Sequence, residues 1–168
     1  MLKVKDIVFV GTKGVCKIEE IKKNPFQGCD KTKDYYVLKP LSSTTNMVVF
    51  LPVDTSVKIR ELISKDEAEK ALVKLKNREI ENSIKDEERF SYYNEIMKNG
   101  MFEDRMNILK YLINRKKTIP KKLFNSQEQK MLATVFECVL EELSVVLKKD
   151  KKQIEDEIVS SFAPNEAM

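Results

Sequence analysis

Positively charged side chains gather in one stretch of the chain, between Met101 and Lys130. The stretch holds eight basic residues and three acidic ones, which leaves a local charge of +5. The basic residues are Arg105, Lys110, Arg115, Lys116, Lys117, Lys121, Lys122 and Lys130. Grouped on a helix–loop–helix segment, such side chains neutralise phosphates, and the resulting affinity falls steeply with salt. The stretch therefore suggests a nucleic-acid contact, although a solvated lysine-rich face is the commoner outcome on composition alone.

Aromatic residues follow Arg89 directly, at Phe90, Tyr92 and Tyr93. On a helix, neighbouring side chains are about 100° apart, so these rings cannot all share one face. We expect Phe90 and Tyr93 to enter the core. Tyr92 is then the ring left outside, where it can stack on bases or wedge between them, with ordinary packing as the alternative.

Residues suited to enzyme chemistry are scarce. The chain has no histidine, the commonest metal ligand and general base near neutral pH. Its cysteines, Cys16, Cys29 and Cys138, form no CxxC pair, so neither a disulfide framework nor a zinc site fits. Four glycines leave little material for a phosphate-binding loop. We expect a protein without catalytic residues, cofactor or metal; a carboxylate-based hydrolase is the remaining enzymatic alternative.

The composition indicates a folded protein. With 42% hydrophobic and 35% charged residues, a chain of 168 residues suits one medium domain or two small ones. No apolar run approaches the roughly 20 residues of a membrane span. The first residues lack the hydrophobic stretch of a signal peptide, so we expect a cytoplasmic protein.

The first fifty or so residues follow the period of β-strands. The expected strands cover Asp6–Val10, Val15–Ile21, Asp34–Leu38 and Met47–Val53. Between them stand turn residues: Gly11–Gly14, Asn24-Pro25 with Gln27-Gly28, and Ser42–Asn46. Because Pro52 cannot donate to a ladder, the last strand should lie at an edge. Four or five short antiparallel strands indicate a small bent sheet or open barrel.

The period then changes to that of helices. A polar segment at Asn77–Glu88 is a hinge or a lead-in to the next helix. Expected helices cover Leu62–Leu75, Phe90–Met97, a segment containing Met106, Leu109 and Ile113, Gln127–Lys148 and Lys152–Phe162. Their expected limits are a Ser64–Glu67 capping box, a stop at Asn99-Gly100, a break at Thr118–Pro120 and a Ser126–Gln129 capping box. The fold class is therefore α+β, with a β-domain at 1–58 and a helical domain, expected to be a bundle, at 59–168.

The order of these segments resembles the CarD/CdnL family of bacterial RNA polymerase-binding transcription regulators along most of the chain. In the β-half the matching segments are Asp6–Val15, Ile18–Ile21, Tyr35–Leu38, Leu51–Asp54 and Arg60–Ile63. In the helical half they are Asn99-Gly100, Phe124–Leu132 and Glu142-Leu143. Each motif is short, and their joint order and spacing carries the resemblance.

The resemblance implies a Tudor-like small β-barrel, similar to a domain of transcription-repair coupling factors, that binds the β subunit of RNA polymerase. An exposed strand would pair with a polymerase strand. Our candidate is the edge at Met47–Pro52, with the turn at Asn24–Gln27 beside it. The polymerase-binding residues would be Asn24, Phe26, Val48, Val49, Phe50, Leu51 and Pro52.

The helical domain of the family implies a contact with promoter DNA, largely independent of sequence, at the upstream edge of the transcription bubble. Such a contact would modulate the stability of open complexes, and polymerase would hold the protein at the nucleoid. The DNA-binding residues would be Arg89, Tyr92, Lys110, Arg115, Lys116, Lys117 and Lys130.

Three features depart from the family pattern. Family members commonly carry a tryptophan wedge where this chain aligns Asp86, and the chain has no tryptophan. Phe90 or Tyr92 is our hypothesis for a substitute. Polymerase-contacting arginines of some relatives align with Asn24 and Phe50, which implies a more apolar interface. The insert at Lys116–Lys122 adds positive charge near the expected DNA face. The alternative function is a protein–protein interaction module that binds polymerase or a repair translocase without binding DNA.

Overall fold

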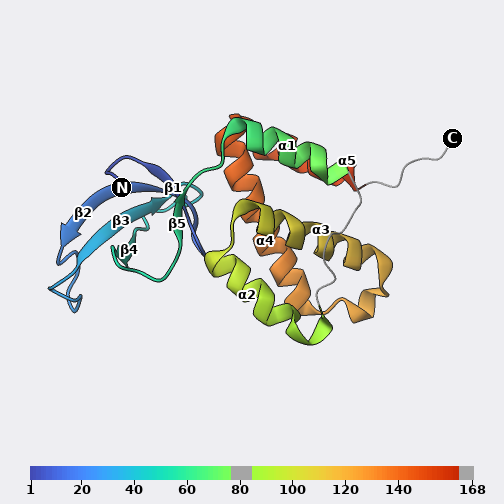
Figure 1. Cartoon of the computed structure of the whole chain (residues 1–168), viewed down its shortest axis with the longest axis horizontal. Helices are drawn as coiled ribbons and strands as arrows, with labels where there is room; N and C mark the ends of the chain where they lie inside the picture. The colour runs from blue at the N-terminus through green and yellow to red at the C-terminus, as the bar shows by residue number, and fades with distance from the viewer. Residues whose placement is uncertain (77–84, 163–168) are drawn as a thin grey trace. The chain divides into compact units, whose positions relative to one another are not determined.

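The computed structural model describes residues 1–76 and 85–162. The chain divides into two compact units, residues 1–62 and 63–168. In Figure 1 the first unit holds the strands and the second holds the helices. The α+β class predicted from the sequence is therefore confirmed.

The first unit is one antiparallel sheet of five strands, in the order β4-β3-β2-β1-β5. The strands are β1 (Ile7–Val10), β2 (Gly14–Lys23), β3 (Asp34–Pro40), β4 (Val49–Pro52) and β5 (Ile59–Glu61). The sheet does not close, because β4 and β5 are its edges and do not pair with each other. A closed Tudor-like barrel is thus not confirmed.

The turns between strands follow the residues that favour them. Gly14 has φ +76° at the end of the β1–β2 turn, and Asn24 and Gly28 also have positive φ after β2. Glycine and asparagine tolerate this left-handed backbone better than other residues. The predicted turns at Gly11–Gly14 and Asn24–Gly28 are confirmed.

The core of the sheet unit comes from alternate residues of its central strands. The buried side chains are Val8, Val10, Cys16, Ile18, Tyr36 and Leu38. Partly buried residues pack against them, namely Leu2, Val49, Leu51, Val57 and Ile59. Because strand side chains alternate between faces, this set defines one inward face of the sheet.

The two strands at the edges differ from their sequence predictions. β4 is shorter than the predicted Met47–Val53, since only Val49–Pro52 pair with β3. Pro52 lies in an edge strand, as expected. β5 pairs with β1 through Ile59, Arg60 and Glu61, so these residues lie with the sheet. The domain limits of 1–58 and 59–168 stay a prediction.

The second unit contains five α-helices and two short 3-10 helices among its described residues. They are α1 (Lys65–Lys76), η1 (Asp86–Glu88), α2 (Arg89–Asn99), α3 (Phe102–Thr118), η2 (Lys121–Leu123), α4 (Ser126–Leu147) and α5 (Lys151–Ser161). Helix α4 packs against α1, α3 and α5. Fully buried side chains at this centre include Val139 and Leu143 of α4, Leu109 of α3 and Ile154 of α5. The helical bundle that the sequence predicted is not confirmed.

Helix starts follow local capping rules, with two corrections to the predicted limits. Ser64 and Glu67 form the expected capping box, with N–O distances of 2.7 and 3.2 Å, so α1 starts at Lys65 and not at Leu62. At α4 the N-cap is Asn125 instead of Ser126, and its partner is Glu128 instead of Gln129. Most of the predicted polar segment falls on residues 77–84, outside the described residues.

The α2–α3 junction requires both a glycine and a buried arginine. A Cβ atom at Gly100 would lie 2.6 Å from the carbonyl oxygen of Ile96. Arg105, only 1% exposed, donates to the carbonyl oxygens of Met97 and Gly100. The guanidinium therefore satisfies carbonyls that the end of α2 leaves without helical partners.

We predict that Gly100→Ala destabilises the helical unit by about 1–3 kcal/mol, because the new methyl group collides with backbone that cannot move aside cheaply. Urea unfolding of the full chain, followed by helical circular dichroism, measures the loss. Ser91→Ala, at an exposed position of α2, is the control and should change stability by less than about 0.5 kcal/mol. Equal stabilities of the two variants would contradict the prediction.

Candidate functional site

One of the two open edges of the sheet is strand β4. Within the described sheet it pairs on one side only, with β3, in the register Val37↔Phe50 and Tyr36↔Leu51. The N–H of Val53 donates to the carbonyl of Asp34 at 2.9 Å. Because backbone polar groups alternate in direction along an antiparallel strand, Leu51 also faces β3, whereas Phe50 faces the open side.

Pro52 has the same parity as Phe50, so its ring nitrogen falls on the open side, where no ladder hydrogen bond to β3 is lost. The position explains how a proline fits this strand. It also limits the open edge, since the N–H donors there come from Phe50 and, where the strand direction continues, from Val48. A partner strand thus finds few backbone positions.

The predicted polymerase-binding residues divide between the two faces of β4. Val49 and Leu51 pack against the core. Phe50 lies on the other face, where its ring centroid is 5.3 Å from that of Phe26. Phe26 in turn packs edge-on against Tyr35 at 5.7 Å.

The fold therefore joins Phe26, from the β2–β3 connection, to the edge strand. Phe26 remains 44% exposed and Val48 remains 42% exposed. Asn24 is exposed at its positive φ, and its side-chain oxygen accepts from the Cys29 thiol. An exposed aromatic and aliphatic surface thus adjoins the unpaired backbone edge.

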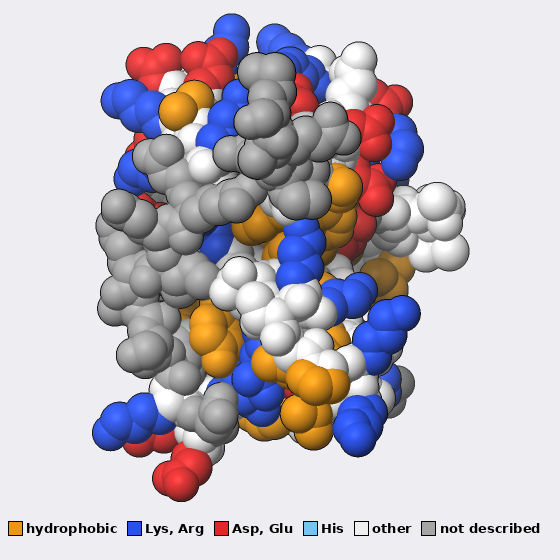
Figure 2. All heavy atoms as spheres, turned by 90° about the vertical axis from the view of Figure 1, so that its right-hand side faces the viewer, with side chains coloured by type: hydrophobic (Ala, Val, Ile, Leu, Met, Phe, Trp, Pro, Cys, Tyr) orange, Lys and Arg blue, Asp and Glu red, His pale blue; other side chains and the backbone are white. Residues whose placement is uncertain are grey.

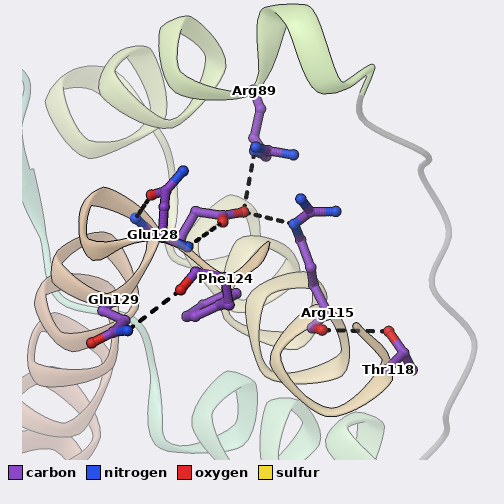
Figure 3. Close-up of polar contacts among 7 residues, drawn as sticks. Arg89, Arg115, Thr118, Phe124, Glu128 and Gln129 are labelled. Atoms are coloured by element: carbon purple, nitrogen blue, oxygen red, sulfur yellow. Dashed lines mark hydrogen bonds and ion pairs between the residues drawn. The ribbon is translucent and has the colours of Figure 1, made fainter. Parts of the chain in front are cut away.

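In the helical unit, a buried carboxylate joins three helix ends. Glu128 is fully buried, and its Oε1 lies 2.6 Å from Nε of Arg115 and 3.4 Å from Nε of Arg89. Its Oε2 accepts from the N–H of Asn125 at 3.1 Å, which completes the capping box of α4. Figure 3 shows both guanidinium groups directed at this carboxylate. The start of α2, the last turn of α3 and the start of α4 are thereby linked.

This arrangement explains where two predicted DNA-binding residues lie. Arg89 is buried, with its guanidinium carbon 5.3 Å from the ring centroid of Phe90. Arg115 is half-buried beside Glu128. Glu128 is one of the three acidic residues between Met101 and Lys130, and its role as a buried partner of two arginines was not predicted from the sequence. The sequence contains a pattern that could have indicated this role: Asn125-x-x-Glu128 is a second possible capping box, one residue before the predicted Ser126–Gln129 box.

The remaining predicted DNA-binding residues are exposed or half-buried. Lys116 and Lys130 are exposed, and Tyr92 is 38% exposed. Lys110 donates to the carbonyl of Lys74 at 3.1 Å. Lys117 is exposed, donates to the carbonyl of Phe162, and lies 5.8 Å from the centroid of that ring.

Charge on the α3–α4 connection is of one sign. No aspartate or glutamate occurs between residues 105 and 127. Lys121 and Lys122 of η2 are exposed, and so are Lys116 and Lys117 in the last turn of α3. Figure 2 shows blue lysine and arginine side chains next to exposed hydrophobic ones on this side of the helical unit. We call Lys116, Lys117, Lys121 and Lys122 the lysine cluster.

Of the aromatic residues after Arg89, Tyr93 lies in the core and Tyr92 outside, as expected, whereas Phe90, also expected in the core, is only half-buried. Tyr93 is fully buried, and its hydroxyl has no hydrogen-bond partner among the described residues. Burial raises the pKa of this hydroxyl well above its usual value, so the group stays neutral. Phe90 is half-buried against Tyr93, and Tyr92 is outside. The side chain of Asp86, at the family's tryptophan position, is not among those that the structure describes.

The described residues were compared with the requirements of a metal site, and Cys138 with those of a reactive thiol. In residues 1–76 and 85–162 no cluster of three or more histidine, cysteine, aspartate or glutamate side chains is placed to hold a metal. Burial raises the pKa of the Cys138 thiol to about 11, which keeps it protonated and unreactive at neutral pH. Among the described helices, none has the length and hydropathy needed to span a membrane.

Comparison with family models gives matches that together extend over both units. The CarD-like/TRCF RID domain matches residues 2–63, and the CarD, C-terminal domain matches residues 70–159. The chain belongs to the CarD family. CarD-family proteins are non-catalytic transcription regulators that interact with RNA polymerase. A search of curated proteins finds no match.

We predict that Glu128→Ala destabilises the helical unit of this CarD-family protein by about 3–5 kcal/mol, because it leaves a buried guanidinium without its counter-charge. Glu137→Ala removes an exposed partner of Lys151 and should cost less than about 1 kcal/mol. Chemical denaturation of both variants measures the difference. A Glu128→Ala loss no larger than that of the control would show that the carboxylate does not hold the three helix ends.

Proposed function

We propose that this protein binds the β subunit of RNA polymerase through its sheet unit and promoter DNA through its helical unit, at the upstream edge of the transcription bubble. The contact with DNA modulates the stability of the open complex. The observation that carries the proposal is the pair of adjacent family matches, each over a unit with a suitable exposed surface. The protein would then act in the cytoplasm, held at the nucleoid by polymerase.

The polymerase contact would form by addition of a strand to β4. The N–H and C=O of Phe50 face the open side and supply backbone hydrogen bonds, while neighbouring side chains supply selectivity. The exposed ring of Phe26, packed on Phe50, extends the apolar surface beside the edge. An apolar contact of this kind fits the absence of arginine at positions 24 and 50.

The DNA contact would use the lysine cluster together with Lys110, Lys130 and Tyr92. Phosphate contacts fix a protein on DNA without reading its sequence, which suits action at many promoters. Arg89 and Arg115 would act mainly by positioning, because both bind the buried Glu128. The Glu128 network would hold the ring of Tyr92 and the lysine cluster on one framework.

The proposed mechanism depends on having both binding surfaces in one chain. Polymerase binding raises the effective concentration of the helical unit at the bubble edge, so weak DNA affinity is sufficient. The alternative is an interaction module that binds polymerase or a repair translocase without DNA. It is favoured by the lack of tryptophan and by the internal contacts of Arg89, Arg115 and Lys117.

We predict that Phe50→Pro weakens binding of the full chain to the purified β subunit at least tenfold more than Phe50→Ala. Both variants lack the ring, but only proline removes the N–H on the open side, and the hydrogen bonds to β3 stay intact. Biolayer interferometry measures both affinities. Equal affinities would exclude strand addition at this edge.

We predict that Lys116→Glu combined with Lys130→Glu shortens the lifetime of promoter open complexes that contain the protein. The lifetime should also depend less on salt concentration. The new carboxylates repel the phosphates that the lysines neutralise. The control, Lys65→Glu with Lys70→Glu on α1, changes the net charge equally. Competitor-challenged filter binding gives the lifetimes. If both double variants behave alike, net charge alone acts and the alternative function gains support.

A further inference from the structure

The connection between α3 and α4 is an ordered turn with an apolar tip. The N–H of Leu123 donates to the carbonyl of Pro120 at 2.9 Å, and that of Phe124 donates to Lys121 at 3.3 Å. At the end of α3, the N–H of Ile119 donates to the carbonyl oxygen of Arg115 at 3.1 Å. Both ends of the turn are therefore held by backbone hydrogen bonds.

Adjacent residues of this turn have opposite environments. Phe124 is 4% exposed and anchors the turn in the core, while Leu123 is 57% exposed. Asn125, which follows Phe124, caps α4 and forms hydrogen bonds with buried Glu128. Leu123 is thus presented outward by a fixed backbone.

The surroundings of Leu123 are cationic. Lys121 and Lys122 precede it directly, Lys116 and Lys117 lie in the last turn of α3, and no acidic residue occurs between positions 105 and 127. A single exposed leucine needs no explanation by itself. A leucine at the tip of an ordered turn within the lysine cluster combines apolar surface with phosphate-binding groups.

We propose that Leu123 is an apolar DNA contact that enters the minor groove or an opened base step while the lysine cluster binds the flanking phosphates. This inference rests on the proposed DNA contact and adds a component to it. Lysine–phosphate binding weakens as added salt reduces the gain from counterion release. Burial of a leucine side chain between sugars or bases adds affinity that does not depend on counterions.

Duplex DNA with a local opening fits this surface better than an anionic membrane. Membrane-surface segments bury an entire apolar helix face, whereas this turn offers one side chain at its tip. The turn also lies inside the match to the CarD C-terminal domain, at residues 70–159.

The test measures binding of the full chain to a fluorescent duplex containing an unpaired segment, at several KCl concentrations, with and without polymerase. Leu123→Ala should weaken binding roughly five- to tenfold at every salt concentration and leave the slope of log K against log salt unchanged. Lys121→Gln with Lys122→Gln should instead reduce that slope by about 0.9 for each phosphate that is no longer neutralised. Val159→Ala, an equally exposed apolar residue of α5 (59%), should bind as the wild type does.

Each outcome separates the two proposals. If the lysine variant lowers the slope but Leu123→Ala binds like the wild type, the role of Leu123 is wrong and the DNA contact stands. If the wild type does not bind DNA, even with polymerase, both fall. If Leu123→Ala abolishes binding to phosphatidylserine vesicles and leaves DNA binding intact, the surface is a membrane contact. Thermal melting of the variants checks that each is folded.

Discussion

The burial of one carboxylate is a constraint on which the arrangement of the helical unit depends. A charge at Glu128 with no exposed surface is tolerable only when cations and hydrogen-bond donors surround it. Arg89, Arg115 and the N–H of Asn125 supply them. Since these groups come from α2, α3 and the start of α4, the three segments must pack around the same carboxylate. The requirement ties together the start of α2, the end of α3 and the start of α4, and Tyr92 and the lysine cluster lie close to these ends in the sequence.

A similar division between holding and contacting side chains recurs in the sheet unit. Val49 and Leu51 pack β4 against the core, while the alternate residues Phe50 and Pro52 lie on the opposite face. Strand alternation thus lets one short segment hold its place on the core and still present side chains on the opposite face. In the turn between α3 and α4, neighbouring residues divide in a similar way, since Phe124 is buried and Leu123 is exposed.

Local chemistry made much of the fold predictable. The Ser64–Glu67 capping box, the glycine turn before β2 and the edge position of Pro52 depend on residues close in sequence. The N-cap of α4 was misplaced because Asn125 and Ser126 are both good caps, and the choice between them depends on where Glu128 finds its cations. Those partners lie 13 and 39 positions away along the chain, beyond any local pattern. Likewise, whether β4 and β5 close into a barrel depends on pairing between distant strands, which alternation alone does not specify.

The proline in β4 has a consequence for the protein in solution. An unpaired strand edge is a template for any other extended chain, including a second copy of the same molecule. With Pro52 contributing no donor, the available edge is too short for a long, self-propagating ladder. The proline that fits this exposed strand into the fold therefore also limits how far the same edge could join copies of the molecule into a long ladder.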